Sequence, residues 1–409
     1  MSDKRVYFIS CGTGKRAALT RRALKALTSC DTWIGPRSLL DAMQDPGNEK
    51  AEPNLIREEE GGDMAALIRE APGENIAVLV GGDAGANEKV CASARAIPEL
   101  APTIFPGIPE VSEFSARTGI SYEGAAILDL TDGRGSLLQA VLRHRKVFAR
   151  MDNYTSLYLE DMKRAGFGDL RIGRMMKTAM GRDRVEYGRL SDMADHLVSE
   201  ALYFFYRKDR PSLPALGIPD DAFVRGNIPM TKREVRTQII AALMPEEDDI
   251  ICDIGAGTGS VTVEMAMQAV RGTVCAIEEK AEGVDLIREN VKKFGLHNVE
   301  IVRGTAPDAF SRLPVPNVAF IGGSGGHFRD IFQVLVSRNP EIRIGVTAIS
   351  PETASEAVER MELYHMDPQM ICMNVSRSKK AGRNHMMMAQ NPVYLIWGQK
   401  KEEEEGGVG

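Results

Sequence analysis

Asp253-Ile-Gly-Ala-Gly-Thr-Gly259 directly overlaps the end of an apolar, β-branched run, Ile250–Ile254, and leads into a stretch with helical periodicity. Because glycine has no Cβ, a loop with three glycines can turn tightly and lets a ligand approach its backbone. The helix N-terminus that follows adds unpaired N–H donors and a partial positive charge. The stretch therefore predicts a ligand-binding loop between a strand and a helix of a parallel α/β sheet. Its candidate binding residues are Asp253, Gly255, Ala256, Gly257, Thr258 and Gly259.

Two further features follow, each one strand and one helix further along the chain. Glu278 comes after the strand-like run Thr273–Ile277, where a carboxylate can accept hydrogen bonds from both hydroxyls of a ribose. A third loop follows Val299–Val302, and its backbone at Thr305 and Ala306 can read the edge of an adenine. Since ligands of α/β sheets bind outside the carboxyl ends of the strands, we expect the three features to form one pocket.

Two cofactors compete for such a pocket. A nicotinamide dinucleotide fingerprint requires Gly-x-Gly-x-x-Gly, but the sixth position here is Ser260. An acidic residue before the loop, Asp253, suits the ammonium of a methionine moiety better than a pyrophosphate. The pattern therefore predicts a pocket for S-adenosylmethionine.

Composition narrows the class of protein. The chain has 409 residues, enough for two or three domains at about 150 residues each. A net charge of -6 and a pI near 5.7 argue against a polynucleotide partner such as RNA. We expect no membrane span and no signal peptide. The six cysteines lie far apart, so we expect them to be reduced, as in the cytoplasm. Six histidines without an i, i+4 pair predict no metal site.

The chain reads as two α/β blocks. We predict a first domain over residues 1–208, a linker over 209–216, a second domain over 217–400 and a disordered acidic tail over 401–409. In the second block the strand candidates indicate a doubly wound parallel sheet that ends in an antiparallel pair, Met370–Val375 and Val393–Trp397. Thr231-Lys-Arg-Glu234 has the spacing of a capping box before a periodic helix.

The second block resembles a known family, the precorrin methylases that methylate carbon 15 and decarboxylate the ring C acetate. The motifs that carry the resemblance are Ile218-Pro-Asp-Asp-Ala-Phe223, Met230-Thr-Lys-Arg-Glu-Val-Arg236, Asp253–Ser260, Gly304–Pro307, Gly322-Gly-Ser-Gly-Gly326 and Asn391-Pro-Val393. The resemblance implies that Thr231 also touches the cofactor. One departure is Thr305, which stands where the family has an aspartate.

The first block resembles the tetrapyrrole methylase superfamily, which has two α/β subdomains. The motifs are Cys11-Gly-Thr-Gly14, Gly82-Asp-Ala84, Pro106-Gly-Ile108 and Gly133-Arg134, and they imply cofactor contacts at Gly12, Gly82, Asp83 and Ala84. The family's residues are replaced at Ser10, Thr13, Ala84, Pro109-Glu110 and Asp132. These departures put the substrate contacts of the first domain in doubt more than its fold.

In this order, the two blocks resemble the fused precorrin-6Y C5,15-methyltransferases (decarboxylating) of cobalamin biosynthesis. The resemblance implies that the first domain methylates carbon 5 of a precorrin, that the second methylates carbon 15 and removes carbon dioxide, and that the enzyme is a homo-oligomer. The alternative is that only the second domain is catalytic and that the first is a ring-binding module.

Candidates for binding the carboxylate-rich tetrapyrrole are arginines and bare backbone N–H groups. They are the loop Gly322, Gly323, Ser324, Gly325 and Gly326, together with Arg236. The catalytic residues are not identified by any motif, and His385, Arg377 and His327 are the weak candidates.

Overall fold

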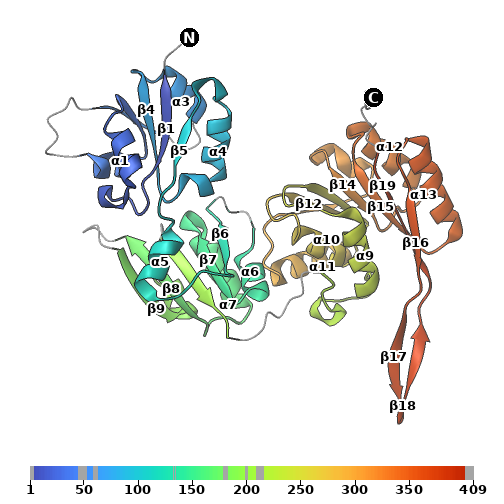
Figure 1. Cartoon of the computed structure of the whole chain (residues 1–409). Coiled ribbons are helices and arrows are strands. Elements are labelled where there is room, and N and C mark those ends of the chain that lie inside the picture. Colours follow the sequence, from blue (N-terminus) through green and yellow to red (C-terminus); the bar gives the residue numbers. More distant parts are fainter. Residues whose placement is uncertain are drawn as a thin grey trace, which may run out of the picture. The chain divides into compact units, whose positions relative to one another are not determined.

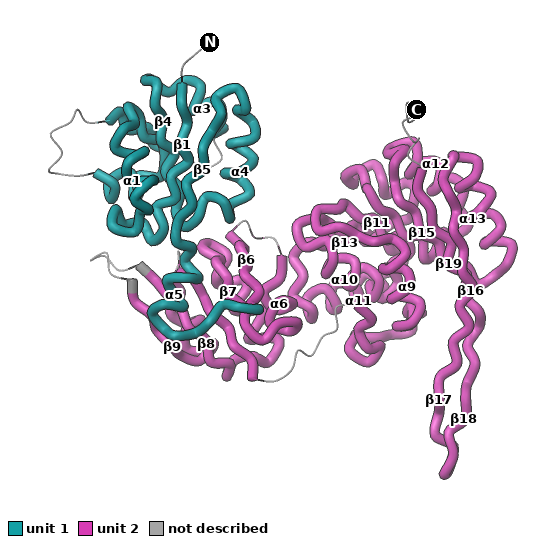
Figure 2. The backbone as a smooth tube through the Cα atoms, viewed as in Figure 1, with its two compact units in different colours: residues 1–124 teal, residues 125–409 magenta. Residues whose placement is uncertain are grey.

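The computed structural model describes residues 4–44, 53–58, 63–131, 133, 135–177, 183–198, 201–208 and 216–400. The chain divides into two compact units, Met1–Gly124 and Ala125–Gly409 (Figure 2). The expectations for Asp132, for most of the linker (residues 209–215) and for the tail (residues 401–409) concern residues outside the described part.

The first unit is a parallel sheet with helices on both faces. Val6 and Phe8 of strand β1 pack into the core on one face, and Ile9 packs into the core on the other. Both faces are therefore buried, as in other parallel sheets. In the described residues the strand order is β3-β2-β4-β1-β5, with bounds Asn54–Arg57, Thr32–Gly35, Asn75–Val80, Arg5–Ser10 and Thr103–Phe105. The helices are α1 (Arg21–Leu27), α2 (Arg37–Met43), α3 (Met64–Glu70), α4 (Glu88–Arg95) and α5 (Glu110–Thr118).

The second unit begins with a mixed sheet. Its core includes Tyr158, Tyr203 and Phe205, all nearly inaccessible to solvent. Strand β6 pairs parallel with β7, whereas the other neighbouring pairs are antiparallel. The strand order over the described residues is β6-β7-β10-β8-β9, with bounds Ala126–Asp129, Lys146–Arg150, Leu202–Tyr206, Arg171–Lys177 and Asp183–Arg189. The helices are α6 (Leu137–Arg143), α7 (Thr155–Arg164) and α8 (Leu190–Ala194).

A larger, doubly wound sheet follows in the same unit (Figure 1). From β11 the chain builds β12 and β13 on one side and then β14 and β15 on the other, all parallel. The order reverses between β11 and β14, where such sheets place their ligand crevice. The order found in the described chain is β13-β12-β11-β14-β15-β19-β16, with bounds Val299–Arg303, Thr273–Glu278, Ile250–Ile254, Val318–Ile321, Arg343–Ala348, Val393–Gly398 and Gln369–Met373. The helices are α9 (Arg233–Leu243), α10 (Ser260–Ala266), α11 (Ala281–Lys293), α12 (Phe328–Arg338) and α13 (Pro351–Leu363).

The predicted α/β class and the antiparallel closing pair are confirmed. Strand β19 pairs antiparallel with β16, but it also pairs with β15 and so lies between them. A separate hairpin that no sequence pattern predicted lies between β16 and β19, and we call it the arm. It consists of β17 (Ser376–Ala381) and β18 (Asn384–Ala389), and it extends away from the sheet (Figure 1).

The predicted capping box before α9 is wrong. The N-cap position is Lys232, and no side chain within the segment caps the helix. Instead, the Asp220 carboxylate accepts a hydrogen bond from the Arg233 N–H at 2.9 Å. An acidic side chain from a distant loop therefore satisfies one of the free donors of the first turn.

Candidate cofactor and substrate site

The glycine loop after β11 depends on backbone conformations that suit glycine. Gly255, Gly257 and Gly259 have φ values of 71°, 58° and 75°, in the left-handed region. A Cβ at Gly255 would lie 2.7–2.9 Å from backbone atoms of Gly323 in the loop after β14. The N–H groups of Gly255 and Ala256 both donate to the Ile277 carbonyl, at 3.0 and 3.1 Å. The loop is thus fixed between two neighbouring strand ends.

Glu278 is held against this loop at the end of β12. One carboxylate oxygen accepts from the Gly257 N–H, and the other from the Lys280 N–H, both at 2.9 Å. The side chain is only 8% exposed. Each carboxylate oxygen has a further lone pair. The carboxylate is therefore oriented and still able to accept hydrogen bonds from a ligand.

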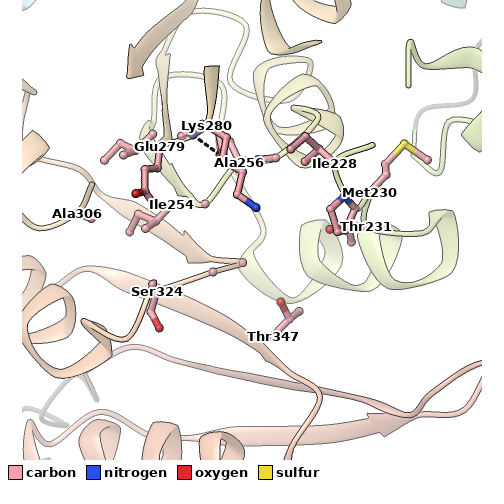
Figure 3. Close-up of a pocket in the computed structure, with 18 of the residues that line it drawn as sticks. Ile228, Met230, Thr231, Ile254, Ala256, Glu279, Lys280, Ala306, Ser324 and Thr347 are labelled. Atoms are coloured by element: carbon pink, nitrogen blue, oxygen red, sulfur yellow. Dashed lines mark hydrogen bonds between the residues drawn. The ribbon is translucent and has the colours of Figure 1, made fainter. Parts of the chain in front are cut away.

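These loops enclose a cavity of about 690 Å³ at the carboxyl ends of the parallel strands. The volume falls within the range of about 300–1,000 Å³ typical of small-molecule sites. Figure 3 shows Ala256, Glu279 and Lys280 together with Ser324 and Thr347 around this space. The predicted residues that line it are Thr231, Gly255, Ala256, Gly257, Glu278, Thr305, Ala306, Gly322, Gly323, Ser324, Gly325 and His327.

Four predicted residues of the same loops do not line the cavity: Asp253, Thr258, Gly259 and Gly326. Asp253 is fully buried at the end of β11, and one of its oxygens accepts from the Thr262 hydroxyl at 2.5 Å. Burial raises the pKa of the Asp253 carboxyl to about 6. Asp253 therefore bonds to the first turn of α10 and does not line the cavity, where the predicted contact with a cofactor ammonium would lie.

The structure also corrects the prediction for Arg236. Its guanidinium is fully buried, 4.7 Å from the centre of the Phe223 ring, and is surrounded by acceptors. It donates to Glu264 at 2.6 Å, to the Ile218 carbonyl at 2.6 Å and to the Thr231 carbonyl at 2.6 Å. Because its donors face protein groups, Arg236 orders the segment that carries Thr231 and does not contact a substrate in the cavity.

Arg377 and His385 lie on the arm and not at the cavity. Arg377 donates to Glu234 at 2.5 Å and to Asp220 at 2.9 Å. These bonds raise the pKa of Arg377 and lower the pKa of Glu234, so both stay charged. His385 is exposed on β18, opposite Lys380. Neither residue lines this cavity, whereas His327 does.

The predicted residues of the first domain also come together, within the first unit. Gly12 and Gly82 exchange backbone hydrogen bonds of 3.0 and 2.8 Å, and Asp83 accepts from the Gly107 N–H at 3.3 Å. The Ser10 hydroxyl donates to the Phe105 carbonyl and accepts from the Ala84 N–H, at 2.5 and 2.8 Å. Ser10, where the resembling family has glycine, therefore joins the loops after β1, β4 and β5.

Several lining residues were not predicted from the sequence. Ile228, Lys280, Thr347, Ile349 and Gln390 belong to no glycine-rich or charged motif. For Lys280 and Gln390 the one signal was a position close to a strand end, and for Thr347 and Ile349 it was a position at the end of one. Ile228 gave no such signal. Among the described residues there is no group of three metal-ligating side chains, and no helix is long and apolar enough to cross a membrane.

The donor set fits S-adenosylmethionine, which supplies a methyl group carried on a sulfonium. The Gly255–Gly257 backbone would hold the methionine end, Glu278 the ribose, and Thr305 and Ala306 the adenine. A side chain at Gly255 would fill this cradle. Fold and cavity together define an S-adenosylmethionine-dependent methyltransferase domain on a Rossmann-like sheet.

Comparison with known proteins identifies the family. The profile of the precorrin methyltransferase domain matches residues 221–401, and that of the tetrapyrrole (corrin/porphyrin) methylases matches residues 5–179. The chain is 36% identical over 184 residues to a probable cobalt-precorrin-6B C(15)-methyltransferase (decarboxylating) of Methanothermobacter thermautotrophicus. That match covers 95% of the relative and 44% of this chain. The chain belongs to the precorrin methyltransferase family and is a C-methyltransferase.

One further relative and one solved structure are also similar to part of the chain. A relative with the same description from Pyrobaculum calidifontis is 36% identical over 183 residues, 44% of this chain and 94% of the relative. The crystal structure of a precorrin-6y C5,15-methyltransferase from Geobacter metallireducens is 35% identical and has a TM-score of 0.44. It covers 46% of this chain and 98% of that chain.

Proposed function

We propose that the protein methylates reduced precorrin-6, or its cobalt form, at carbons 5 and 15 and removes carbon dioxide from the ring C acetate. The observation that supports this most directly is the cavity between β11 and β14, where Glu278 and the Gly255–Gly257 backbone face the Ser324–Gly325 loop. Relatives described as carbon-15 methyltransferases (decarboxylating) match this part of the chain.

The residues around the cavity position reactants more than they react. Methyl transfer needs a nucleophilic ring carbon held in line with the methyl group, so the site contributes mainly by orientation. The backbone N–H groups of Ser324 and Gly325, which line the cavity, suit a peripheral carboxylate. Lys232 and Lys280 line the same cavity and add positive charge.

Decarboxylation requires a proton as well as an electron acceptor. The bond between the acetate methylene and its carboxylate breaks, carbon dioxide leaves, and the electron pair enters the conjugated ring. A proton then returns to the methylene carbon, which becomes a methyl group. His327 lines the cavity, and an imidazole exchanges protons near neutral pH. We assign this proton to His327.

We assign carbon-15 methylation and decarboxylation to residues 217–400 and carbon-5 methylation to residues 1–208, joined by a linker at 209–216. The tetrapyrrole methylase profile over residues 5–179 and the joined loops at Ser10, Gly12 and Gly82 support the second assignment. In the alternative, the first domain only binds the ring. It is motivated by Pro109 and Glu110, which occupy the start of α5 where the resembling family has two serines.

The test uses the full chain with S-adenosylmethionine and reduced precorrin-6, and the product is weighed by mass spectrometry. We expect two methyl gains and one loss of carbon dioxide. The Glu278→Ala variant should make a product with one methyl gain and no loss of carbon dioxide. A wild-type product with a single methyl gain and carbon dioxide loss would favour the ring-binding alternative, and no product at all would refute the proposal.

We further propose that the enzyme is a cytoplasmic homo-oligomer that works without a polynucleotide or membrane partner. Sedimentation velocity of the full chain should give a mass that is a multiple of the chain's 44.8 kDa. A single 44.8 kDa species at micromolar concentration would contradict the oligomer.

A further inference from the structure

Ile349 is an apolar side chain in an unusual position. It follows the last residue of β15, and 77% of its surface is exposed, the largest fraction of any large apolar side chain among the described residues. A single exposed isoleucine is common on protein surfaces. This one, however, lines the cavity that holds the methyl donor, so a ligand in that cavity can cover it.

The backbone around Ile349 fixes where the side chain can be. Ala348 pairs with Tyr394, so Ile349 and Val393 are the next residues on β15 and β19 at the same edge of the sheet. Ser350 follows at once and caps α13, with its hydroxyl accepting from the Thr353 N–H at 3.3 Å. Because Ile349 sits between a paired strand and a capped helix, its exposure is built into the fold.

The cavity has two halves with different chemistry. The loops after β11, β12 and β13 provide the glycine backbone, Glu278 and Thr305, which suit the polar parts of the methyl donor. The half on the other side of β11 is formed at β14, β15 and β19 and includes His327, Ile349 and Val393. The methyl acceptor must occupy this second half, because the first is taken by the donor.

We propose that Ile349, together with the neighbouring cavity residue Val393, contacts one face of the tetrapyrrole ring and sets the affinity for that substrate. This inference rests on the proposed function. A conjugated ring has an apolar face and carries its carboxylates at the periphery. The apolar face then covers Ile349, while the Ser324–Gly325 amides in the same half of the cavity reach the rim. Burial of the isoleucine on binding favours the complex by the hydrophobic effect.

The experiment compares Ile349→Ala, Ile349→Leu and a control, Leu363→Ala. Leu363 ends α13 in the same domain, is 60% exposed and does not line the cavity. Ile349→Ala should raise the KM for reduced precorrin-6 about tenfold, with kcat within about twofold of wild type. Ile349→Leu should restore most of the affinity, and Leu363→Ala should leave the KM unchanged.

Four measurements separate this inference from its alternatives. The Kd for S-adenosylhomocysteine and the melting temperature should stay at wild-type values in all variants, because the side chain is exposed without substrate. An unchanged KM in Ile349→Ala, with an active wild type, overturns the inference alone. A changed oligomeric mass in size-exclusion chromatography would overturn it in favour of contact with a second copy. An inactive wild type would instead refute the proposed function.

Discussion

Replacement of Gly283 by alanine should separate stability from cofactor affinity. Gly283 lies in the first turn of α11, behind the Glu278 carboxylate. An added Cβ would lie 2.6 Å from the Glu278 Cγ, 2.9 Å from its carboxyl carbon and 3.0 Å from the Gly257 carbonyl. Because contacts below 3.0 Å cannot be tolerated, Glu278 or the glycine loop must move.

The substitution favours the helix but weakens the binding of the cofactor. Alanine in place of glycine within a helix favours folding by up to about 1 kcal/mol, which offsets the cost of moving the Glu278 side chain. A hydrogen bond to a charged group contributes about 1.5–3 kcal/mol. Loss of one such bond between Glu278 and a ribose hydroxyl therefore weakens binding roughly tenfold to a hundredfold. We expect Gly283→Ala to keep a melting temperature close to that of wild type and to lose this affinity.

The assay is titration calorimetry with S-adenosylhomocysteine, performed on wild type, Gly283→Ala, Glu278→Ala and the double variant. If the clash acts through the carboxylate, Gly283→Ala should have little further effect in the Glu278→Ala background. Wild-type affinity in Gly283→Ala would refute the reasoning. So would additive losses in the double variant, because they would show that the two changes act independently.

Three further predictions concern the same domain. Burial raises the Asp253 pKa to about 6, so this group contributes stability below about pH 4 that is lost as the pH rises through 6. Asp253→Asn should remove this pH dependence and raise the free energy of unfolding above pH 7 by up to about 3 kcal/mol, as measured by urea unfolding. If the free energies of unfolding of wild type and variant changed with pH in parallel, the prediction would be contradicted. Gly255→Ala and Gly326→Ala both place a side chain at positive φ, which costs about 1–2 kcal/mol of stability. Only the Cβ added at Gly255 would clash with backbone atoms. Calorimetry should show that Gly255→Ala alone abolishes S-adenosylhomocysteine binding at the site within residues 217–400, and equal losses in both would count against the cradle. Arg236→Met leaves the buried Glu264 without its cation and should lower the free energy of unfolding by about 3–5 kcal/mol. Addition of Glu264→Gln should recover part of that loss in urea unfolding, and no recovery would argue against the ion pair as the cause.

The donor half of the cavity was predictable because each of its parts follows its own strand. The glycine loop, Glu278 and Thr305 are each visible as a local pattern, and the parallel sheet brings their strand ends to one edge. In the acceptor half the Gly322–Gly326 loop was also visible as a local pattern, but the residues at the end of β15 were not. Thr347 within β15 and Ile349 just after it are ordinary residues, and the parallel pairing of β15 with β14 places them at the same edge of the sheet as the donor loops.

Long-range polar contacts explain the wrong predictions. Thr231 and Arg236 lie in a segment whose spacing suggested a cap and a substrate contact. Asp220, thirteen residues before Arg233, caps the helix instead. Arg236 donates a hydrogen bond to Glu264, 28 residues later in the chain. Neither partner is visible from local spacing, because the three-dimensional contact depends on how the loop before α9 folds back.

The place of β19 has a consequence for protein synthesis. This strand comes last of the seven in chain order, yet it is bonded on both sides, to β15 and to β16. While a ribosome has not yet released residues up to Gly398, β16 has no neighbour and β15 has an open edge. The nascent methyltransferase domain therefore exposes a strand edge that can aggregate until residues up to Gly398 have been released, whereas the parallel sheet of residues 5–105 is complete long before.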